Sequence, residues 1–383
     1  MYDYYDLKKE YKDFESPIAV ISVSGKDISK DKKGFAISDI IVELSCGFEA
    51  SVAEFKIYNG YDMLLHEFLF DDLKKYITLG SPVSIWLGYK SRVLNVFRGF
   101  ISQVNFTFHL QEMPAVEVHC MDLKGIMMAN SYAKQINAQY YCEAVKSVFE
   151  QPFYQRLKGE IGVYEDILIA DTPDKPEQPQ GGGGEKESTD RTIEMVNESD
   201  YEFVVRAAKR FNYEFFQSCG TICFRRAKSD TDELMVISPE TGMMAFDVGY
   251  DITGLVGQIE VRNVDAGKGK LLKASQKLQG KISEGSKAKQ LVSKQKKIYI
   301  DPTAANQEEA GFRAEYLVDE VSYRFGTLEA EMVGIPELMP GKFIILEGLG
   351  TAASNTFYLS SVRHSMEANG FYQTHISGKA ANL

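Results

Sequence analysis

Alternating hydrophobic and polar residues dominate the last quarter of the chain, from Ala314 to Leu383. Successive side chains in a strand point to opposite faces, so this alternation is typical of strands with one buried face. Glycine, proline and asparagine separate the runs and mark turns. The pattern predicts one helix, which ends near Phe325, and then four strands. The expected strands lie within 326–336, 338–348, 356–366 and 370–378.

The first 122 residues show the same kind of pattern. Hydrophobic residues alternate in six short runs with the spacing of a meander, so a compact β-barrel or β-sandwich is expected. Residues 63–76 predict a short helical or irregular excursion, and the polar and aromatic residues 1–15 predict an arm. The six predicted strands are 18–23, 40–44, 53–57, 79–89, 96–108 and 115–122.

Helical spacing replaces the alternation in the middle of the chain. Residues 140–149 place their hydrophobic side chains on one helical face. Ser199 and Glu202 have the spacing of a capping box, which predicts the start of a second helix. Residues 171–189 are rich in glycine, proline and charge, which is typical of a flexible, solvated loop. A small α+β domain is therefore expected here.

The strand pattern returns at residues 244–262, and a lysine-rich stretch then interrupts it. Asp301 and Pro302 predict the start of the next helix, because proline is tolerated at the first helical position. These patterns predict three domains. They are a first β domain at 1–122, an α+β domain at 123–240 with its loop at 171–189, and a second β domain at 241–383 with a lysine-rich insert at 263–300 and a helix at 302–325.

Two stretches of the β regions resemble each other, residues 79–120 and residues 338–376. Each begins with a turn containing glycine and proline that enters an apolar strand. A loop, an aromatic-led strand and a final alternating strand follow in both. Identity between the stretches is low, and any two β-meanders share such features. The pattern alone therefore leaves both an internal duplication and a chance similarity open.

Charge and composition exclude several classes of protein. The chain has 383 residues, 44% of them hydrophobic and 25% charged, which is ordinary for a globular protein of two to three domains. No apolar run is long enough to span a membrane, and the N-terminus does not resemble a signal peptide, so folding in a bacterial cytoplasm is expected. A net charge of −11 argues against a general nucleic-acid-binding protein.

Positive charge is concentrated in one segment. Residues 263–297 hold ten lysines and two acidic residues, which gives this segment a net charge of +8. Since the whole chain has a net charge of −11, the rest of the chain carries −19. A solvated, mobile loop is the favoured interpretation. The alternatives are a basic surface that docks on an acidic partner, and a nucleic-acid contact, which the lack of interleaved aromatic residues weakens. The candidate docking residues are Lys268, Lys270, Lys273, Lys277, Lys281, Lys287, Lys289, Lys294, Lys296 and Lys297.

Motifs of catalysis, metal binding and cofactor binding are lacking in the sequence. The five cysteines are odd in number and scattered, so they do not form a disulfide framework, and Cys219 and Cys223 are interpreted as turn and strand positions of a hairpin. Of the five histidines, His364 and His375 are candidate strand neighbours with a structural or interface role. Adjacent acidic pairs such as Asp71–Asp72 and Glu308–Glu309 are interpreted as solvated surface. No enzyme activity, cofactor or metal is predicted.

The order of these elements resembles the phage late control D / VgrG family, the hub proteins of contractile tails and injection systems. The residues that carry the resemblance are patterns of fold rather than of chemistry, and they extend over most of the chain. They lie in Leu79–Tyr89, the Phe97–Ser102 run with Asp122, the helix at 198–211, the Gly334–Lys342 turn and the Tyr358–His364 strand.

The resemblance implies an α+β, mainly β fold with two similar tube-forming β-barrel-like domains and an inserted small α+β domain. It also implies a homotrimer, in which six similar units form a ring that joins a tail tube to a central spike. The expected partners are a tube or tube-initiator protein, a spike protein and other baseplate proteins, and nucleic acid is not expected.

Three functions are compared. The expected function is a non-enzymatic hub in an assembled phage tail or injection particle. The first alternative is the hub portion of a type VI secretion spike; such spikes continue into an oligonucleotide-binding-fold domain and a β-helix needle, a C-terminal module that this sequence lacks. The second is a tail-tip cell-wall hydrolase, which no motif supports.

Overall fold

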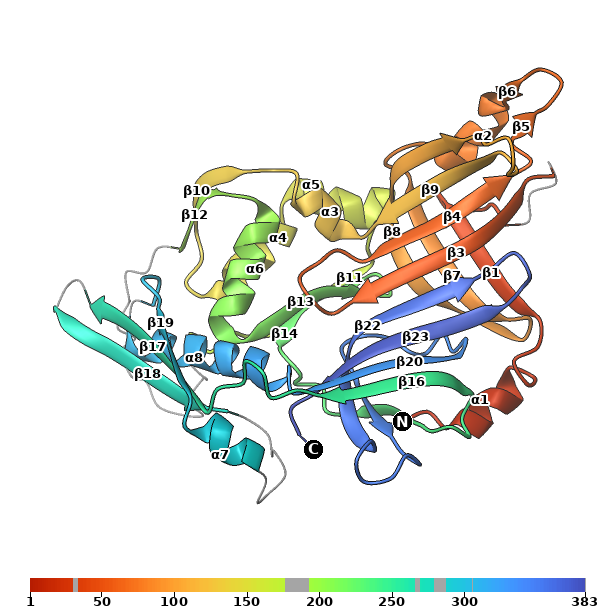
Figure 1. The fold of residues 1–383 in the computed structure, drawn as a ribbon. Coiled ribbons are helices and arrows are strands. Elements are labelled where there is room, and N and C mark those ends of the chain that lie inside the picture. Colours follow the sequence, from red (N-terminus) through yellow and green to blue (C-terminus); the bar gives the residue numbers. More distant parts are fainter. Residues whose placement is uncertain (30–33, 176–192, 266–268, 279–286, 305, 383) are drawn as a thin grey trace, which may run out of the picture.

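The computed structural model describes residues 1–383 except 30–33, 176–192, 266–268, 279–286, 305 and 383. Strands predominate over helices in the described part, which confirms the prediction of a mainly β, α+β fold. Figure 1 shows a large β body on one side of the molecule and two smaller lobes on the other.

The β body is one sheet of 13 strands. Its main path runs β16-β20-β23-β22-β3-β4-β9-β8-β7-β1-β2, and β21 and β15 branch from β22. Seven strands come from the N-terminal region: β1 (Pro17–Val23), β2 (Lys26–Asp27), β3 (Ala36–Ser45), β4 (Val52–Tyr58), β7 (Pro82–Tyr89), β8 (Arg92–Thr107) and β9 (Ala115–Met121). The others are β15 (Glu233–Ile237), β16 (Met243–Tyr250), β20 (Gly326–Val333), β21 (Phe343–Leu346), β22 (Asn355–Met366) and β23 (Tyr372–Ala380).

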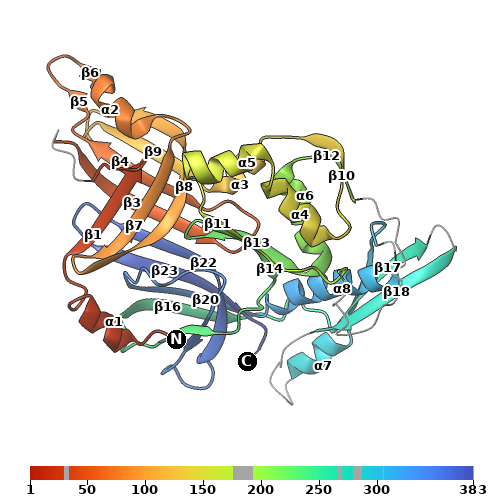
Figure 2. The same ribbon diagram turned by 180° about the vertical axis from the view of Figure 1, so that it is seen from behind.

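The predicted alternation corresponds to alternating burial in the sheet. In β20, Leu328, Ala330 and Met332 point into the core, and the residues between them face outward. The sheet folds over on itself, so that strands from both ends of the chain enclose one core (Figures 1 and 2). The two β regions share this core. Their predicted division into a first domain at 1–122 and a second at 241–383 remains a prediction.

The N-terminal residues form a helix rather than the predicted arm. Helix α1 (Tyr4–Glu10) is capped by Asp3, whose side chain accepts hydrogen bonds from two backbone N–H groups. Leu7 and Tyr11 are buried in the core of the β body. Of the aromatic residues that suggested an arm, Tyr11 is therefore a core residue and Tyr4 and Phe14 pack against the core, while Tyr2 and Tyr5 remain exposed.

The excursion between β4 and β7 is structured, as the sequence indicated for residues 63–76. It consists of β5 (Tyr61–Asp62), β6 (Glu67–Phe68) and α2 (Phe70–Ile77). Leu73, Tyr76 and Ile77 of α2 are buried against the β body. The hairpin before the helix projects from the end of the molecule that is most distant from the two lobes (Figure 1).

The first lobe follows β9 and has a hydrophobic core of its own. Helix α6 begins at the predicted capping box, where Ser199 and Glu202 each bind the other's backbone N–H, and it ends at Asn212 in the left-handed conformation. Most of the predicted loop at 171–189 lies outside the described residues. The elements are α3 (Leu123–Met127), β10 (Tyr132–Ile136), α4 (Tyr141–Phe149), α5 (Pro152–Arg156), a π-helical turn (Leu157–Ile161), β11 (Asp166–Ile169), β12 (Ile193–Glu198), α6 (Asp200–Phe211), β13 (Tyr213–Ser218) and β14 (Thr221–Arg226).

The second lobe contains the lysine-rich stretch. A three-stranded sheet in the order β18-β17-β19 packs one face on helix α8 around a third core. The favoured interpretation of this stretch as a mobile loop is therefore wrong for the described residues. The elements are β17 (Gln258–Asp265), β18 (Lys270–Lys277), α7 (Lys287–Ser293), β19 (Lys296–Ile300) and α8 (Gln307–Ser322).

Helix α8 begins later than the proline signal predicted. Its N-cap is Asn306, whose side chain accepts the N–H of Glu309 at 2.9 Å. Asp301 instead closes a turn, since its Oδ1 accepts hydrogen bonds from the N–H and the hydroxyl of Thr303. The hydrogen bonds of the Asp301 side chain thus stabilise a turn at the place where the helix was predicted to start.

The contact between α1 and the β body yields a first prediction. The hydroxyl of Tyr11 donates to Oε1 of Glu337 at 2.6 Å, and both side chains are buried. Tyr11→Phe removes the donor and leaves the carboxylate in an apolar site, so the free energy of unfolding should fall by about 1–3 kcal/mol. Urea unfolding at constant m-value measures the change. Tyr5→Phe, on the exposed side of α1, is the control and should leave the midpoint unchanged; equal effects would contradict the prediction.

Candidate subunit-interaction surface

The large sheet contains the same strand order twice. The first half-sheet runs β3-β4-β9-β8-β7-β1, and the second half-sheet runs β16-β20-β23-β22-β21-β15. In both, the fourth strand pairs with the third along one edge and with the fifth along part of the other. This repeated order favours an internal duplication, which the sequence had left open.

The pairing of individual residues shows which positions of the two half-sheets correspond to each other. The pairing of β8 with β9 shifts register between Ile101 and Gln103, and that of β22 with β23 shifts between Leu359 and Ser361. One row of partners crosses each half-sheet from that point. The rows are Gln103, His119, Glu54 and Ile41 in the first half-sheet, and Ser361, Ser377, Glu329 and Asp247 in the second.

The two half-sheets are joined by the antiparallel pairing of β22 with β3. Residues 361–366 lie opposite residues 45–40, in that order. Side chains from both strands that point inward are buried in the shared core: Val362, His364 and Met366 from β22, and Ile40, Val42 and Leu44 from β3. This half-sheet junction makes eight strands, from β16 to β8, into one continuous wall.

His364 lies at the centre of the half-sheet junction and is fully buried. Its Nε2–H donates to the carbonyl of Leu338 at 3.1 Å, and its Nδ1 accepts from the hydroxyl of Tyr372 at 3.0 Å. Burial lowers the pKa of His364 to about 4, because the charged imidazolium is poorly solvated there. His375 lies on the adjacent strand but on the outward face, where it is 2.9 Å from Glu329. The two histidines are thus strand neighbours on opposite faces.

Both ends of the eight-stranded wall are open among the described residues. The outer edge of β16 has no pairing partner, and neither does the edge of β8 beyond Ile101. Phe246 on β16, Phe106 at the end of β8 and the adjacent Phe108 are 45%, 44% and 47% exposed. Exposed edges with aromatic residues promote pairing with another chain, so these two edges are the candidate interaction surface.

Most lysines proposed from the sequence lie on the second lobe. Lys268 and Lys281 fall outside the described residues, and the other eight are exposed. Lys270, Lys273 and Lys277 are on β18, Lys287 and Lys289 on α7, Lys296 and Lys297 on β19, and Lys294 between α7 and β19. The folded lobe thus presents a basic surface.

Glu260 organises part of this basic surface, and the sequence analysis did not identify it. Its carboxylate is buried in the open face of the three-stranded sheet. Lys296 and Arg262 bind it, and Lys273 lies 3.4 Å away. These cations lower the pKa of Glu260 to about 2. The alternation of Glu260 with Ile259 and Val261 was a signal that the glutamate points to the opposite face from the core.

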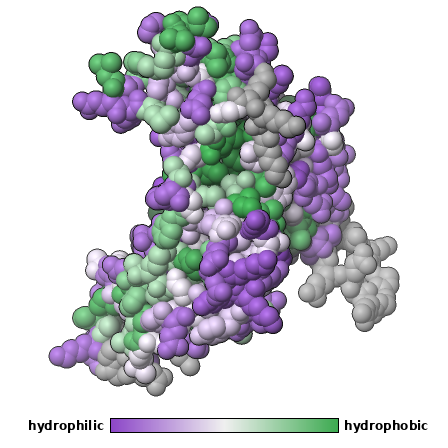
Figure 3. Space-filling view, turned by 90° about the vertical axis from the view of Figure 1, so that its right-hand side faces the viewer, coloured by the Kyte–Doolittle hydropathy of each residue, from purple (hydrophilic) through white to green (hydrophobic). Residues whose placement is uncertain are grey.

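A second exposed apolar surface lies at the tip of the first half-sheet. The β5–β6 hairpin meets the end of β8 and the turn after it there, through aromatic contacts of Tyr61 with Phe108 and of Phe68 with Phe106. Figure 3 faces this end of the molecule and shows hydrophobic side chains at its top and in a hollow beneath. The most exposed apolar residues of the tip are Met63, Leu64, Leu65, Leu110 and Met113.

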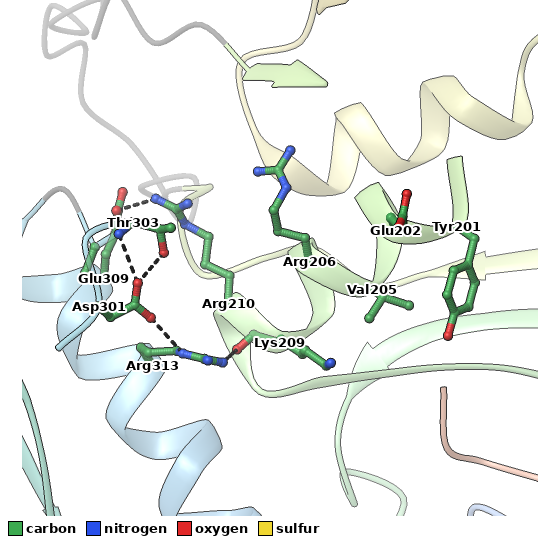
Figure 4. A pocket seen from close by; sticks show the side chains of 11 residues that line it. Tyr201, Glu202, Val205, Arg206, Lys209, Arg210, Asp301, Thr303, Glu309 and Arg313 are labelled. Atoms are coloured by element: carbon green, nitrogen blue, oxygen red, sulfur yellow. Dashed lines mark hydrogen bonds and ion pairs between the residues drawn. The ribbon is translucent and has the colours of Figure 1, made fainter. Parts of the chain in front are cut away.

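A polar pocket of about 480 Å³ lies between α6 and the start of α8 (Figure 4). Its three arginines are paired with acidic residues. Arg210 binds Glu309, and Nε of Arg313 lies 2.9 Å from Asp301. The Arg210–Glu309 pair, together with the hydrogen bond that Arg313 donates to the carbonyl of Lys209, connects the first lobe to the second, so a structural role explains the pocket.

The cysteine predictions agree with the structure. Cys219 is in the turn and Cys223 in the strand of the β13–β14 hairpin. All five thiols are free, and burial raises the pKa of Cys46 to about 12. In the part of the chain that the structure describes, no cluster of His, Cys, Asp and Glu has metal-binding geometry. No helix in those residues is long and apolar enough to cross a membrane.

Known structures share this architecture. A tail protein from Neisseria meningitidis superimposes with a TM-score of 0.66 at 12% identity, over 96% of this chain and 100% of that one. The 43 kDa tail protein of prophage MuSo2 from Shewanella oneidensis gives 0.65 at 12% identity, over 95% and 98%. An E. coli component of the type VI secretion system gives 0.55 at 10% identity, over 94% of this chain and 76% of that one.

These similarities show that the chain has the fold of phage tail proteins. No curated protein matches the sequence. A family model described as the Alg8 N-terminal domain is similar to residues 185–368, which is less than half of the chain.

The buried histidine predicts a pH dependence of stability. The unfolded chain binds a proton at His364 near pH 6.5 and the folded chain only near pH 4. The contribution to stability is therefore complete above pH 6.5 and is lost as the pH falls towards 4, by about 3 kcal/mol. His364→Gln should flatten the slope of unfolding free energy against pH in this window. The exposed His66→Gln should keep the wild-type slope, and an unchanged slope in His364→Gln would refute the prediction.

Proposed function

We propose that this protein is the structural hub of a contractile phage tail or injection machine. Three copies form a ring of six similar half-sheets, which joins a six-fold tail tube to a three-fold central spike. The role is structural rather than enzymatic, and the partners are a tube or tube-initiator protein, a spike protein and other baseplate proteins. The protein is made in the bacterial cytoplasm and becomes part of the assembled particle.

The observation that carries this proposal is the duplicated sheet with two open ends. One chain supplies two equivalent half-sheets, so three chains supply six. The open edges of β16 and β8 differ from each other, and a contact between unlike surfaces is head-to-tail, which yields a ring when the rotation closes. The fold shared with tail proteins supports the same conclusion.

The hub part of a type VI secretion spike is the second candidate. It is favoured by the similarity to the E. coli secretion component, of which 76% is covered by this chain. The duplicated sheet serves equally in both machines. The two candidates differ in the spike, which is a separate protein in the first and a continuation of the hub chain in the second.

The basic surface of the second lobe is proposed to dock on an acidic partner in the particle. Three exposed apolar residues, Leu271, Ile298 and Ile300, share the open sheet face with Lys273 and Lys296. A mixed basic and apolar face fits a protein surface better than it fits a phosphate backbone, which requires an array of uncommitted cations. Here Lys273 and Lys296 are already engaged by Glu260.

A trimer is the first test of the hub. Light scattering of the purified chain should give a mass of about 129 kDa, three times the 43.0 kDa of one copy. Particle images should show a ring with a central opening. A monomer at all concentrations up to 100 μM or so, above the Kd of a stable assembly, would reject the hub.

Nucleic-acid binding is the test of the basic surface. In a salt titration, the protein should not retain double-stranded DNA even at low salt, because the acidic remainder of the chain repels phosphate. The variant with Lys270→Glu, Lys277→Glu and Lys287→Glu should behave identically with DNA. Salt-dependent binding by the wild type that this variant loses would assign the surface to DNA instead.

A further inference from the structure

We infer that the seam between neighbouring copies repeats the half-sheet junction, with the end of β8 of one copy paired in antiparallel register to β16 of the next. The partner is thus a second copy of this chain, and the inference rests on the proposed ring. What it adds is a specific strand edge, a specific register and a set of side chains that become buried. We call this contact the inter-copy seam.

The strands of the seam follow from equivalence. Within one chain, the fourth strand of the second half-sheet, β22, pairs with the first strand of the first half-sheet, β3. The equivalent of β22 is β8, and the equivalent of β3 is β16. The same junction between copies therefore joins β8 to β16. These are the two strands whose edges are open at the ends of the eight-stranded wall, among the described residues.

The register of the seam follows from the rows of partners. Ile41 is the last member of the row that starts at Gln103, and Asp247 is the last member of the row that starts at Ser361. In the half-sheet junction, Ile41 lies opposite Ser365, four residues beyond Ser361. The residue four beyond Gln103 is Thr107. Thr107 of one copy therefore lies opposite Asp247 of the next.

Burial at the two places supports this register. Met366 and Ile40 face each other in the half-sheet junction and are only 8% and 4% exposed. Their equivalents in the seam are Phe108 and Phe246, which are 47% and 45% exposed in the single chain.

The next inward position shows the same contrast. His364, fully buried, corresponds to Phe106, which is 44% exposed. The seam thus covers three exposed phenylalanines with the same kind of inward contact that the chain makes internally.

The polarity of the other face agrees with the same arrangement. Residues of the two rows that point outward are mostly polar or charged, including Gln103, Glu54, Glu329 and Asp247. A register shifted by one residue would turn the phenylalanines to this outward face and bring polar residues into the core. The alternation of side chains along a strand therefore excludes registers in which β8 is displaced along β16 by an odd number of residues. It is consistent with the register that places Thr107 opposite Asp247.

Disulfide cross-linking tests the register. The double variant Thr107→Cys/Asp247→Cys, treated with copper phenanthroline, should give cross-linked dimers and trimers on a non-reducing gel, and no larger species. The Cα atoms of two residues that lie opposite each other in an antiparallel pair are about 4.5–5.5 Å apart, a separation that a disulfide can bridge.

Two double variants are matched controls. Ile41→Cys/Ser365→Cys occupies the equivalent position in the half-sheet junction and should form a disulfide within one chain. Thr107→Cys/Ala245→Cys is displaced by two residues along β16 and should cross-link at least tenfold more slowly. Wild-type protein, with its own five thiols, gives the background.

The outcomes separate the seam from the hub. Cross-linked trimers at the predicted pair alone support the seam. A trimer by light scattering that cross-links equally at Ala245, or not at all while the Ile41/Ser365 control forms its disulfide, overturns the seam and leaves the hub proposal standing. A monomer overturns both.

A substitution at the edge provides a second readout. Phe246→Asp places a charge in the buried part of the seam, so the dissociation constant of the trimer should rise about tenfold or more. The monomer should remain folded, because Phe246 is exposed in the single chain. Leu110→Asp, at the exposed β8–β9 turn, should leave assembly unchanged. Equal assembly by the Phe246 and Leu110 variants, with both folded by circular dichroism, would also overturn the seam.

Discussion

The pairing of β22 with β3 is the contact on which the rest of the structure depends. It brings together strands that are more than 300 residues apart in sequence and converts two half-sheets into one wall around one core. Closing so long a loop costs conformational entropy, which the burial of six inward side chains and the ladder of backbone hydrogen bonds offset. The same pairing also fixes which strand edges remain open at the two ends of the wall.

The two lobes are attached to the wall and to each other through polar as well as apolar contacts. Glu214 of the first lobe accepts a hydrogen bond from Tyr358 of β22 at 2.5 Å and is bound by Arg225. Arg210 and Arg313 link α6 to the residues around α8. Buried charges of this kind are costly unless paired, so they favour one arrangement of the lobes over alternatives of similar shape.

In the lysine-rich stretch, the core of the second lobe places on an ordered surface residues that the sequence alone suggested were in a loop. Ten lysines in 35 residues resemble a solvated loop when they are counted along the chain. Folding divides them, because α8 covers one face of the small sheet and Glu260 gathers three cations on the other. Repulsion between Arg262, Lys273 and Lys296 is thus offset by one buried carboxylate, which no count of residues along the chain reveals.

Much of the local structure was determined by the sequence itself. Alternation located most strands of the large sheet, the capping box at Ser199 and Glu202 located α6, and the hairpin around Cys219 was identified from its turn chemistry, because these signals act between residues a few positions apart. The helix at residues 4–10 was missed because the buried contacts of Leu7 and Tyr11 are made with residues distant in sequence, such as Glu337. The start of α8 was missed because two local signals compete there: the side chain of Asp301 binds Thr303 in a turn, and Asn306 caps the helix instead. Tertiary structure alone decided the duplicated strand order, the burial of His364 and the open edges at Phe106 and Phe246. These features are pairings between distant strands, and hydrophobic periodicity specifies which face of a strand is buried but not which strand lies beside it.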